Sequence, residues 1–244
     1  MRWVVNPLTQ HMKKVILPLL AMTVLGMGMY AAIYMSPLSQ PGPSGMVKLE
    51  RIKAHHGVQT GDLIFQTSPS SLGKAIQLAT HSKYSHVGII YEQDGQFYVY
   101  EAIQPVSKAP LGEWIDRGVD DHYVIKRLKN ANDVLTPEAL TRMIAVGKRF
   151  EGKDYDGQFA WSDDRLYCSE LVWKIYQEGA GIEIGQLQTL SSFDLSSELV
   201  KQKLEEHYGG NIPLDEPVIS PEAMFQSPLL KTVDEGRQKR KVKA

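Results

Sequence analysis

The dipeptide Asp94-Gly95 constrains the fold of this 244-residue chain more tightly than any other local feature. It separates two runs, 85–93 and 96–103, that are rich in β-branched and aromatic residues. Asp-Gly is a preferred centre for a type I′ turn, so the two runs are predicted to form an antiparallel hairpin. A turn of this length also fixes how the two strands are aligned.

The alignment of the hairpin decides which side chains share a face. A two-residue turn pairs Gln93 with Gln96, and the same ladder sets His86 opposite Ile103. Glu101 is then the diagonal neighbour of His86, within hydrogen-bonding reach on one face. A carboxylate in that place can orient an imidazole, fix its tautomer and stabilise the protonated ring. The alternative is that this face is simply solvated.

Shorter patterns elsewhere predict a mixture of strands and helices. Strands are expected at 63–66 and 123–128, helices at 68–80, 136–152, 168–179 and 192–207, and a closing strand or turn at 218–225. This order favours an α+β domain, in which an antiparallel sheet has its helices packed to one side. Trp114 fits either the core or the lining of a cleft, and aromatic residues are more often core.

The N-terminal region has the composition of a membrane segment. Residues 15–35 carry no charge, a run of roughly 21 residues that could cross a bilayer as a helix. Basic residues precede this run, so residues 1–14 are predicted to be a cytoplasmic lead, with the rest of the chain across the membrane. A cleaved signal peptide is the competing interpretation. Both place the domain in the periplasm or another extracytoplasmic space.

Three further segments complete the predicted organisation. Residues 36–50 are rich in Pro, Gly and Ser and are expected to form a flexible tether. Residues 51–233 would be the folded domain, and the basic residues 234–244 a disordered tail. The formal net charge of −1 gives no reason to expect a nucleic acid as partner. The oligomeric state is left open.

Cys168 is the single cysteine of the chain, which excludes an intrachain disulfide and any site built from several thiolates. A lone cysteine is commonly a small buried apolar residue. Here, however, it begins the helix predicted at 168–179. Free backbone N–H groups and the positive end of the helix dipole at that position favour the thiolate over the thiol. The position therefore favours a nucleophile.

Three blocks of sequence resemble the signature blocks of the NlpC-type papain-like hydrolases. They are GDLIF at 61–65, HVGI at 86–89 and YCSELV at 167–172. The cysteine block comes last here, whereas it comes first in the common arrangement. The chain thus resembles the circularly permuted branch, the YaeF/YiiX-like permuted papain-like amidases. The segment 218–228 resembles the closing segment of that branch, and the similarity covers residues 58–233.

The resemblance implies a papain-like fold and a role for each matching residue. Cys168 would be the nucleophile, His86 its base, and Glu101 the residue that orients the base. Tyr155 stands at about the family's spacing for an active-site tyrosine, where it would help to stabilise the oxyanion. Glu170 replaces the glycine usual in unpermuted members and is expected to alter the cleft beside the nucleophile, so their substrates are not carried over.

The expected reaction is hydrolysis of an amide or ester bond through an acyl-enzyme, with no metal or organic cofactor. The predicted compartment suggests cell-wall peptides or lipid-like molecules as substrates. Two alternatives stay open: an acyltransferase that uses the same residues, and a non-catalytic envelope binding module that keeps the fold. His55, His56 and His81 lack the spacing of zinc ligands on a helix.

Overall fold

The computed structural model of this protein describes residues 57–236. The lead, anchor and tether predicted at 1–14, 15–35 and 36–50 lie outside the described residues, and so do residues 237–244 of the predicted tail. Within 57–236, no helix combines the length and the hydropathy that crossing a bilayer would need.

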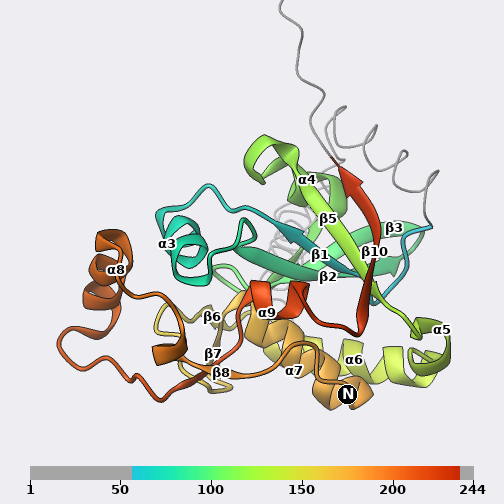
Figure 1. The fold of residues 1–244 in the computed structure, drawn as a ribbon. Coiled ribbons are helices and arrows are strands. Elements are labelled where there is room, and N and C mark those ends of the chain that lie inside the picture. Colours follow the sequence, from blue (N-terminus) through green and yellow to red (C-terminus); the bar gives the residue numbers. More distant parts are fainter. Residues whose placement is uncertain (1–56, 237–244) are drawn as a thin grey trace, which may run out of the picture. The chain divides into compact units, whose positions relative to one another are not determined.

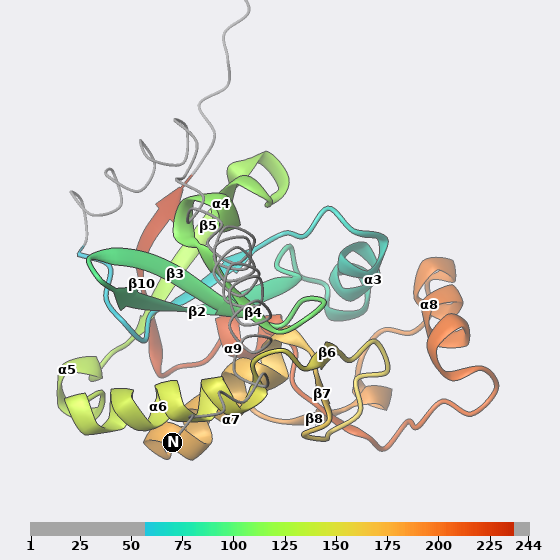
Figure 2. The same ribbon diagram turned by 180° about the vertical axis from the view of Figure 1, so that it is seen from behind.

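An antiparallel sheet forms the centre of the described domain (Figures 1 and 2). Within residues 57–236 it has six strands, in the order β10-β5-β1-β2-β3-β4. They are β1 (Leu63–Gln66), β2 (His86–Gln93), β3 (Gln96–Glu101), β4 (Ser107–Pro110), β5 (Tyr123–Leu128) and β10 (Leu230–Gly236). Every neighbouring pair is antiparallel, which confirms the predicted type of sheet.

The predicted hairpin is present as β2 and β3. Asp94 and Gly95 have φ angles of 52° and 75°, the positive values that a type I′ turn requires. Gln93 pairs with Gln96, so the predicted register is confirmed. The ladder is shorter than predicted, because β3 ends at Glu101, where the chain turns to form β4.

Helices and short strands account for most of the remaining described chain. The helices are α3 (Ser71–Thr80), α4 (Leu111–Asp116), α5 (Ala131–Val134), α6 (Pro137–Phe150), α7 (Cys168–Ala180), α8 (Glu198–Tyr208) and α9 (Pro221–Phe225), with 3-10 turns η1 (Val119–Asp121) and η2 (Leu190–Ser192). Two-residue strands form two small pairs, β6 (Asp154–Tyr155) with β7 (Arg165–Leu166) and β8 (Gln188–Thr189) with β9 (Pro217–Val218).

Capping side chains explain where several of these helices begin. The hydroxyls of Ser70, Thr136 and Ser197 each accept a hydrogen bond from a backbone N–H in the first turn that follows. The cap at Ser197 also corrects one prediction, because the helix expected at 192–207 begins only at Glu198.

The C-terminal predictions need two corrections. The closing segment at 218–225 contains the end of β9 and the short helix α9, with Ser220 as its cap. Strand β10 runs through the predicted domain boundary at residue 233 and continues to Gly236, because residues 234–236 pair with β5. Residues 234–236 are therefore part of the sheet rather than of a tail.

Both faces of the sheet are covered, which corrects the prediction that the helices lie on one side. Helices α6 and α7 lie below the sheet in Figure 1, and α4 lies above it. Alternation along β1 explains the two layers: Leu63 and Phe65 join the core with α6 and α7, whereas Ile64 packs with Trp114 of α4. Helix α4 was not predicted, because its six residues are too few for a helical pattern to show.

A buried ion pair links the turn before β1 to strand β5. Arg127 Nε and Nη2 donate to the two carboxylate oxygens of Asp62 at 2.6 and 2.7 Å. Asp62 also accepts a hydrogen bond from the backbone N–H of Gln59, as a turn residue would. Burial raises the pKa of Asp62, while the contacts with Arg127 oppose that shift.

Removing one partner of this pair tests its role in stability. Arg127→Leu is expected to lower the free energy of unfolding by about 3 to 5 kcal/mol, because it leaves the Asp62 carboxylate buried and unpaired. Arg149→Leu is the matched control: it removes an exposed pair with Glu178 and should cost less than about 1 kcal/mol. Urea unfolding curves would show the difference, and equal losses would contradict the prediction.

Candidate active site

Cys168 is the first residue of α7 and is 2% exposed. The residue before it, Tyr167, has extended backbone angles, and the first backbone bond within the helix runs from Leu171 N–H to Tyr167 O at 3.0 Å. The sulfur is thus held at the helix start, where the dipole favours negative charge. Ser169 and Tyr167 both hydrogen-bond to the backbone of Ile219, which ties this first turn to the chain before α9.

His86 begins β2 and lies beside the carboxylate of Glu101 on β3. Its Nε2 is 2.6 Å from Glu101 Oε2. With Nε2 engaged there, Nδ1 is the nitrogen left for the thiol of Cys168. Burial lowers the pKa of His86, but hydrogen bonds to Cys168 and Glu101 and the charges of both outweigh it and raise the pKa to about 9. The imidazole is therefore protonated at neutral pH.

Glu101 is completely buried and receives three hydrogen bonds. Besides His86, Trp114 Nε1 donates to Oε2 at 2.8 Å, and Arg117 donates to Oε1. Burial opposes ionisation of this carboxyl, yet the bond from His86 and the charges of His86 and Arg117 hold its pKa below the usual value. The ring of Trp114 also stacks on the imidazole, with centroids 5.6 Å apart and planes at 19°.

Tyr155 lies on β6 and lines the same cleft as His86. Burial raises its pKa well above the usual value, and the nearby charges of Cys168 and Asp156 raise it further. Its hydroxyl therefore stays protonated and able to donate at any ordinary pH. The structure thus brings together all four residues singled out in the sequence: Cys168, His86, Glu101 and Tyr155.

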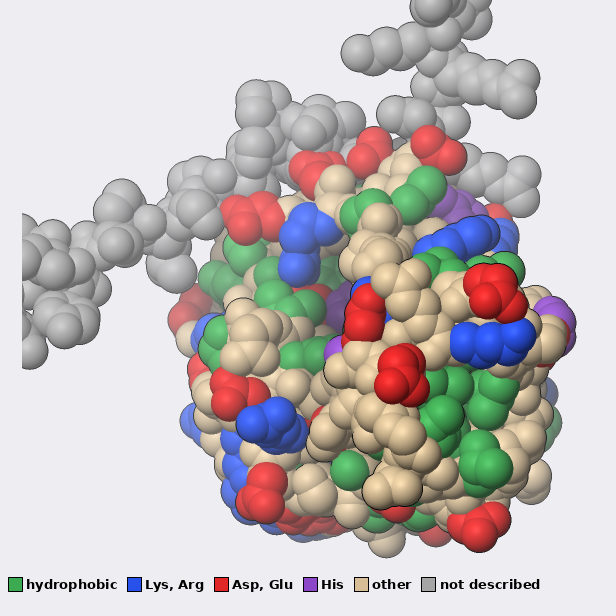
Figure 3. Space-filling model, turned by 90° about the vertical axis from the view of Figure 1, so that its left-hand side faces the viewer, with side chains coloured by type: hydrophobic (Ala, Val, Ile, Leu, Met, Phe, Trp, Pro, Cys, Tyr) green, Lys and Arg blue, Asp and Glu red, His purple; other side chains and the backbone are tan. Residues whose placement is uncertain are grey.

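Two hollows meet at these residues. The first, here called the polar cleft, has a volume of about 460 Å³ and is lined by His86, Tyr155, Arg117 and several serines. The second, here called the apolar chamber, lies between α3 and α8 and includes Cys168 in its lining. Leu72 and Ile76 of α3 contribute to both. Figure 3 shows this side of the domain, with hydrophobic side chains gathered next to charged ones.

Sequence reasoning missed the contribution of α4 to this site. Arg117 follows α4 directly, and no pattern in the sequence gives it a role, whereas Trp114 fits either the core or a cleft on sequence alone. The structure shows Trp114 buried and bonded to Glu101. The one available signal was a tryptophan and an arginine shortly after the hairpin, and neither type is specific enough to reveal a contact with Glu101.

The expectation for Glu170 was wrong. It contributes to neither the polar cleft nor the apolar chamber. Instead it is fully buried, accepts a hydrogen bond from the backbone N–H of Tyr167 at 3.4 Å, and pairs with Lys174 at 2.8 Å. Burial raises its pKa to about 7. Glu170 therefore caps the N-terminus of α7 and does not line either hollow.

Replacing the buried carboxylate tests its hold on the imidazole. Glu101→Gln is expected to lower the pKa of His86 clearly below about 9, because the neutral amide no longer stabilises the imidazolium. NMR titration of the His86 ring protons measures this. Glu92→Gln, an exposed change on β2, is the control and should leave the titration unchanged. An unaltered His86 in Glu101→Gln would contradict the proposed coupling.

Comparisons with known proteins agree with this architecture. The family model for the permuted papain-like amidase enzymes, YaeF/YiiX, C92 family, matches residues 57–234. The uncharacterized protein YiiX of Escherichia coli K12 is 50% identical over 175 residues, covering 72% of this chain and 85% of YiiX. The crystal structure described as metalloprotein yiiX from Escherichia coli O157:H7 is also 50% identical, with a TM-score of 0.70, covering 73% of this chain and 98% of that one. The chain therefore belongs to the permuted papain-like amidase family of the YaeF/YiiX type.

Proposed function

We propose that the protein is a cysteine hydrolase that cleaves an amide or ester bond through an acyl-enzyme. Cys168 is the nucleophile, His86 the base, and Glu101 the residue that orients the base. One observation carries the proposal: a continuous line of interactions from Cys168 through His86 to the buried carboxylate of Glu101. Membership in a family of papain-like amidases supports the same chemistry.

The first half of the reaction forms a thioester. The Cys168 thiolate attacks the carbonyl carbon, and the electron pair of the C=O bond moves onto oxygen. Backbone N–H groups at the start of α7 and the hydroxyl of Tyr155 donate to this oxyanion. When the intermediate collapses, the bond to the leaving nitrogen or oxygen breaks, and the leaving group takes a proton from the His86 imidazolium.

The second half consumes one water. Neutral His86 accepts a proton from the water as its oxygen attacks the thioester carbonyl. The C–S bond then breaks, releasing the carboxylic acid and restoring the thiolate beside the imidazolium. Glu101 keeps its charge throughout, as its lowered pKa allows, and holds the ring in one orientation.

The described residues do not fit a metal in this site. The description of the Escherichia coli structure as a metalloprotein raises the question for this chain. Within residues 57–236, His, Cys, Asp and Glu side chains form no group of three or more that could hold a metal ion. Glu101, the nearest carboxylate, already accepts from His86, Trp114 and Arg117. No step of the proposed reaction passes through a metal.

The proposal includes a place of action. The uncharged run at 15–35 supports attachment to the membrane, with the domain in the periplasm or another extracytoplasmic space. Substrates would then be cell-wall peptides or lipid-like molecules of the envelope. An acyltransferase would use the same acyl-enzyme with an alcohol or amine in place of water, and a binding module would not form one.

The reactivity of the Cys168 thiol tests whether this residue is an activated nucleophile. Iodoacetamide is expected to alkylate Cys168 at pH 6.5 well ahead of a model thiol, because the imidazolium stabilises the thiolate. His86→Ala should slow alkylation and lower hydrolysis by about 100-fold or more. The control is His81→Ala, since His81 is exposed and lies outside both hollows next to Cys168. A Cys168 that reacts like a model thiol would favour the binding module.

Substrate is found by comparing the full chain with its Cys168→Ala variant. Each is incubated with cell-wall fragments and with membrane lipid extract, and products are identified by mass spectrometry. The wild type is expected to release a carboxylic acid that the variant does not. Equal products from both would disprove the mechanism, and transfer to an added alcohol or amine would identify a transferase.

A further inference from the structure

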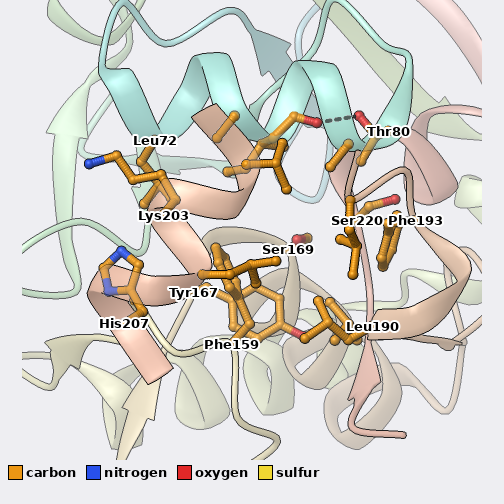
Figure 4. Close-up of a pocket in the computed structure, with 18 of the residues that line it drawn as sticks. Leu72, Thr80, Phe159, Tyr167, Ser169, Leu190, Phe193, Lys203, His207 and Ser220 are labelled. Atoms are coloured by element: carbon orange, nitrogen blue, oxygen red, sulfur yellow. Dashed lines mark hydrogen bonds between the residues drawn. The ribbon is translucent and has the colours of Figure 1, made fainter. Parts of the chain in front are cut away.

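The apolar chamber next to Cys168 has no role in the mechanism derived above. In Figure 4, α3 runs along one wall, with Phe159, Tyr167 and Leu190 on the opposite side. Lys203 and His207 of α8 lie at one end. The remaining lining is almost entirely aliphatic and aromatic, and Cys168 is part of it.

We propose that this chamber binds the aliphatic acyl chain of the substrate, so that the substrates are fatty acyl esters or amides rather than cell-wall peptides. The inference rests on the proposed function and adds the substrate class to it. The acyl carbonyl would lie at Cys168, with its chain between α3 and α8.

Most hydroxyl groups of the chamber are already paired within the protein. Thr80 donates to the backbone of Ile76 at 2.8 Å, a bond drawn in Figure 4, and Ser169 donates to Ile219 at 2.8 Å. Ser220 accepts from Ala223 at 3.0 Å as a helix cap. Among the described lining residues, Tyr208 alone has a buried hydroxyl without a partner.

This pairing disfavours a peptide in the chamber. Each peptide unit carries one N–H and one C=O, and burying them without partners costs free energy for every unit. A single unpaired hydroxyl can donate one hydrogen bond and accept another, so it serves at most one such unit. An alkyl chain has no polar groups to desolvate and gains free energy with each methylene that leaves water.

The size of the chamber favours an unbranched chain. Its volume is about 80 Å³. A dry apolar cavity of about 150 Å³ is known to hold a benzene ring, and the volume of this chamber is about half of that. A linear chain that enters lengthwise needs the smallest cross-section of any acyl group.

The polar cleft supplies the complementary half of the site. It lies on the His86 side of Cys168 and contains Tyr155 and the exposed, positively charged Arg117. The leaving alcohol or amine must be reached by His86, which gives it a proton. The acyl chain on the Cys168 side and a polar leaving group on the His86 side therefore match the two hollows.

A series of p-nitrophenyl esters from acetyl to decanoyl tests the proposal on the full chain, below the concentrations at which the esters form micelles. kcat/KM is expected to rise roughly four-fold with each added methylene until the chamber is full. Mass spectrometry should find the acyl group on Cys168.

Variants of the lining residues distinguish binding in the chamber from a general effect of the ester's hydrophobicity. Ala79 is only partly buried, and Ala79→Phe should lower kcat/KM for the long esters roughly ten-fold while the acetyl ester is unaffected. Leu195→Ala should move the optimum to longer chains. Lys74→Phe adds the same ring at an exposed position of α3 outside the chamber and should change nothing.

The outcomes distinguish the two proposals. If the acetyl ester acylates Cys168 as well as the longer esters do, or if Ala79→Phe and Lys74→Phe behave alike, the acyl-chain inference fails and the proposed function stands. If no ester of any length acylates Cys168, the proposed function itself fails.

Discussion

The buried carboxylate of Glu101 is the interaction on which the candidate site depends. A charge without exposure to water is costly unless every lone pair finds a donor. Here the donors come from β2, from α4 and from the residue after α4, and they all meet on one side chain. The same carboxylate that ties α4 to the hairpin also helps Cys168 to raise the pKa of His86.

This arrangement explains why the site lies at the open end of the β2–β3 hairpin, between the helices that cover the two faces of the sheet. Helix α7 packs under the sheet and brings Cys168 to its first turn, whereas α4 covers the opposite face and supplies Trp114. His86 and Glu101 lie between these layers, at the end of β2 and β3 away from the turn. Neither layer alone would position both a thiol and an oriented imidazole.

Two hollows that differ in polarity lie beside the Cys168–His86 pair and share Leu72 and Ile76. The polar cleft has the protonated imidazole and an arginine, and the apolar chamber has aliphatic walls whose hydroxyls are almost all engaged elsewhere. Such a division suits a substrate that is itself polar at one end and apolar at the other. Helix α3 contributes Leu72 and Ile76 to both hollows, so its placement controls how they join.

The local sequence was sufficient to predict a feature wherever that feature depends on a short pattern acting through the backbone. The Asp94-Gly95 turn set the register that brings Glu101 to His86, and the cysteine at a helix start was visible from helical spacing, because both depend only on residues close in the chain. Tertiary packing alone placed Arg117 and Trp114 on Glu101, turned Glu170 away from the cleft, covered the second face of the sheet with α4, and opened the chamber between α3 and α8. These features join segments that are distant in the chain, and such contacts arise from complementary shape and burial, which leave no periodic pattern in the sequence.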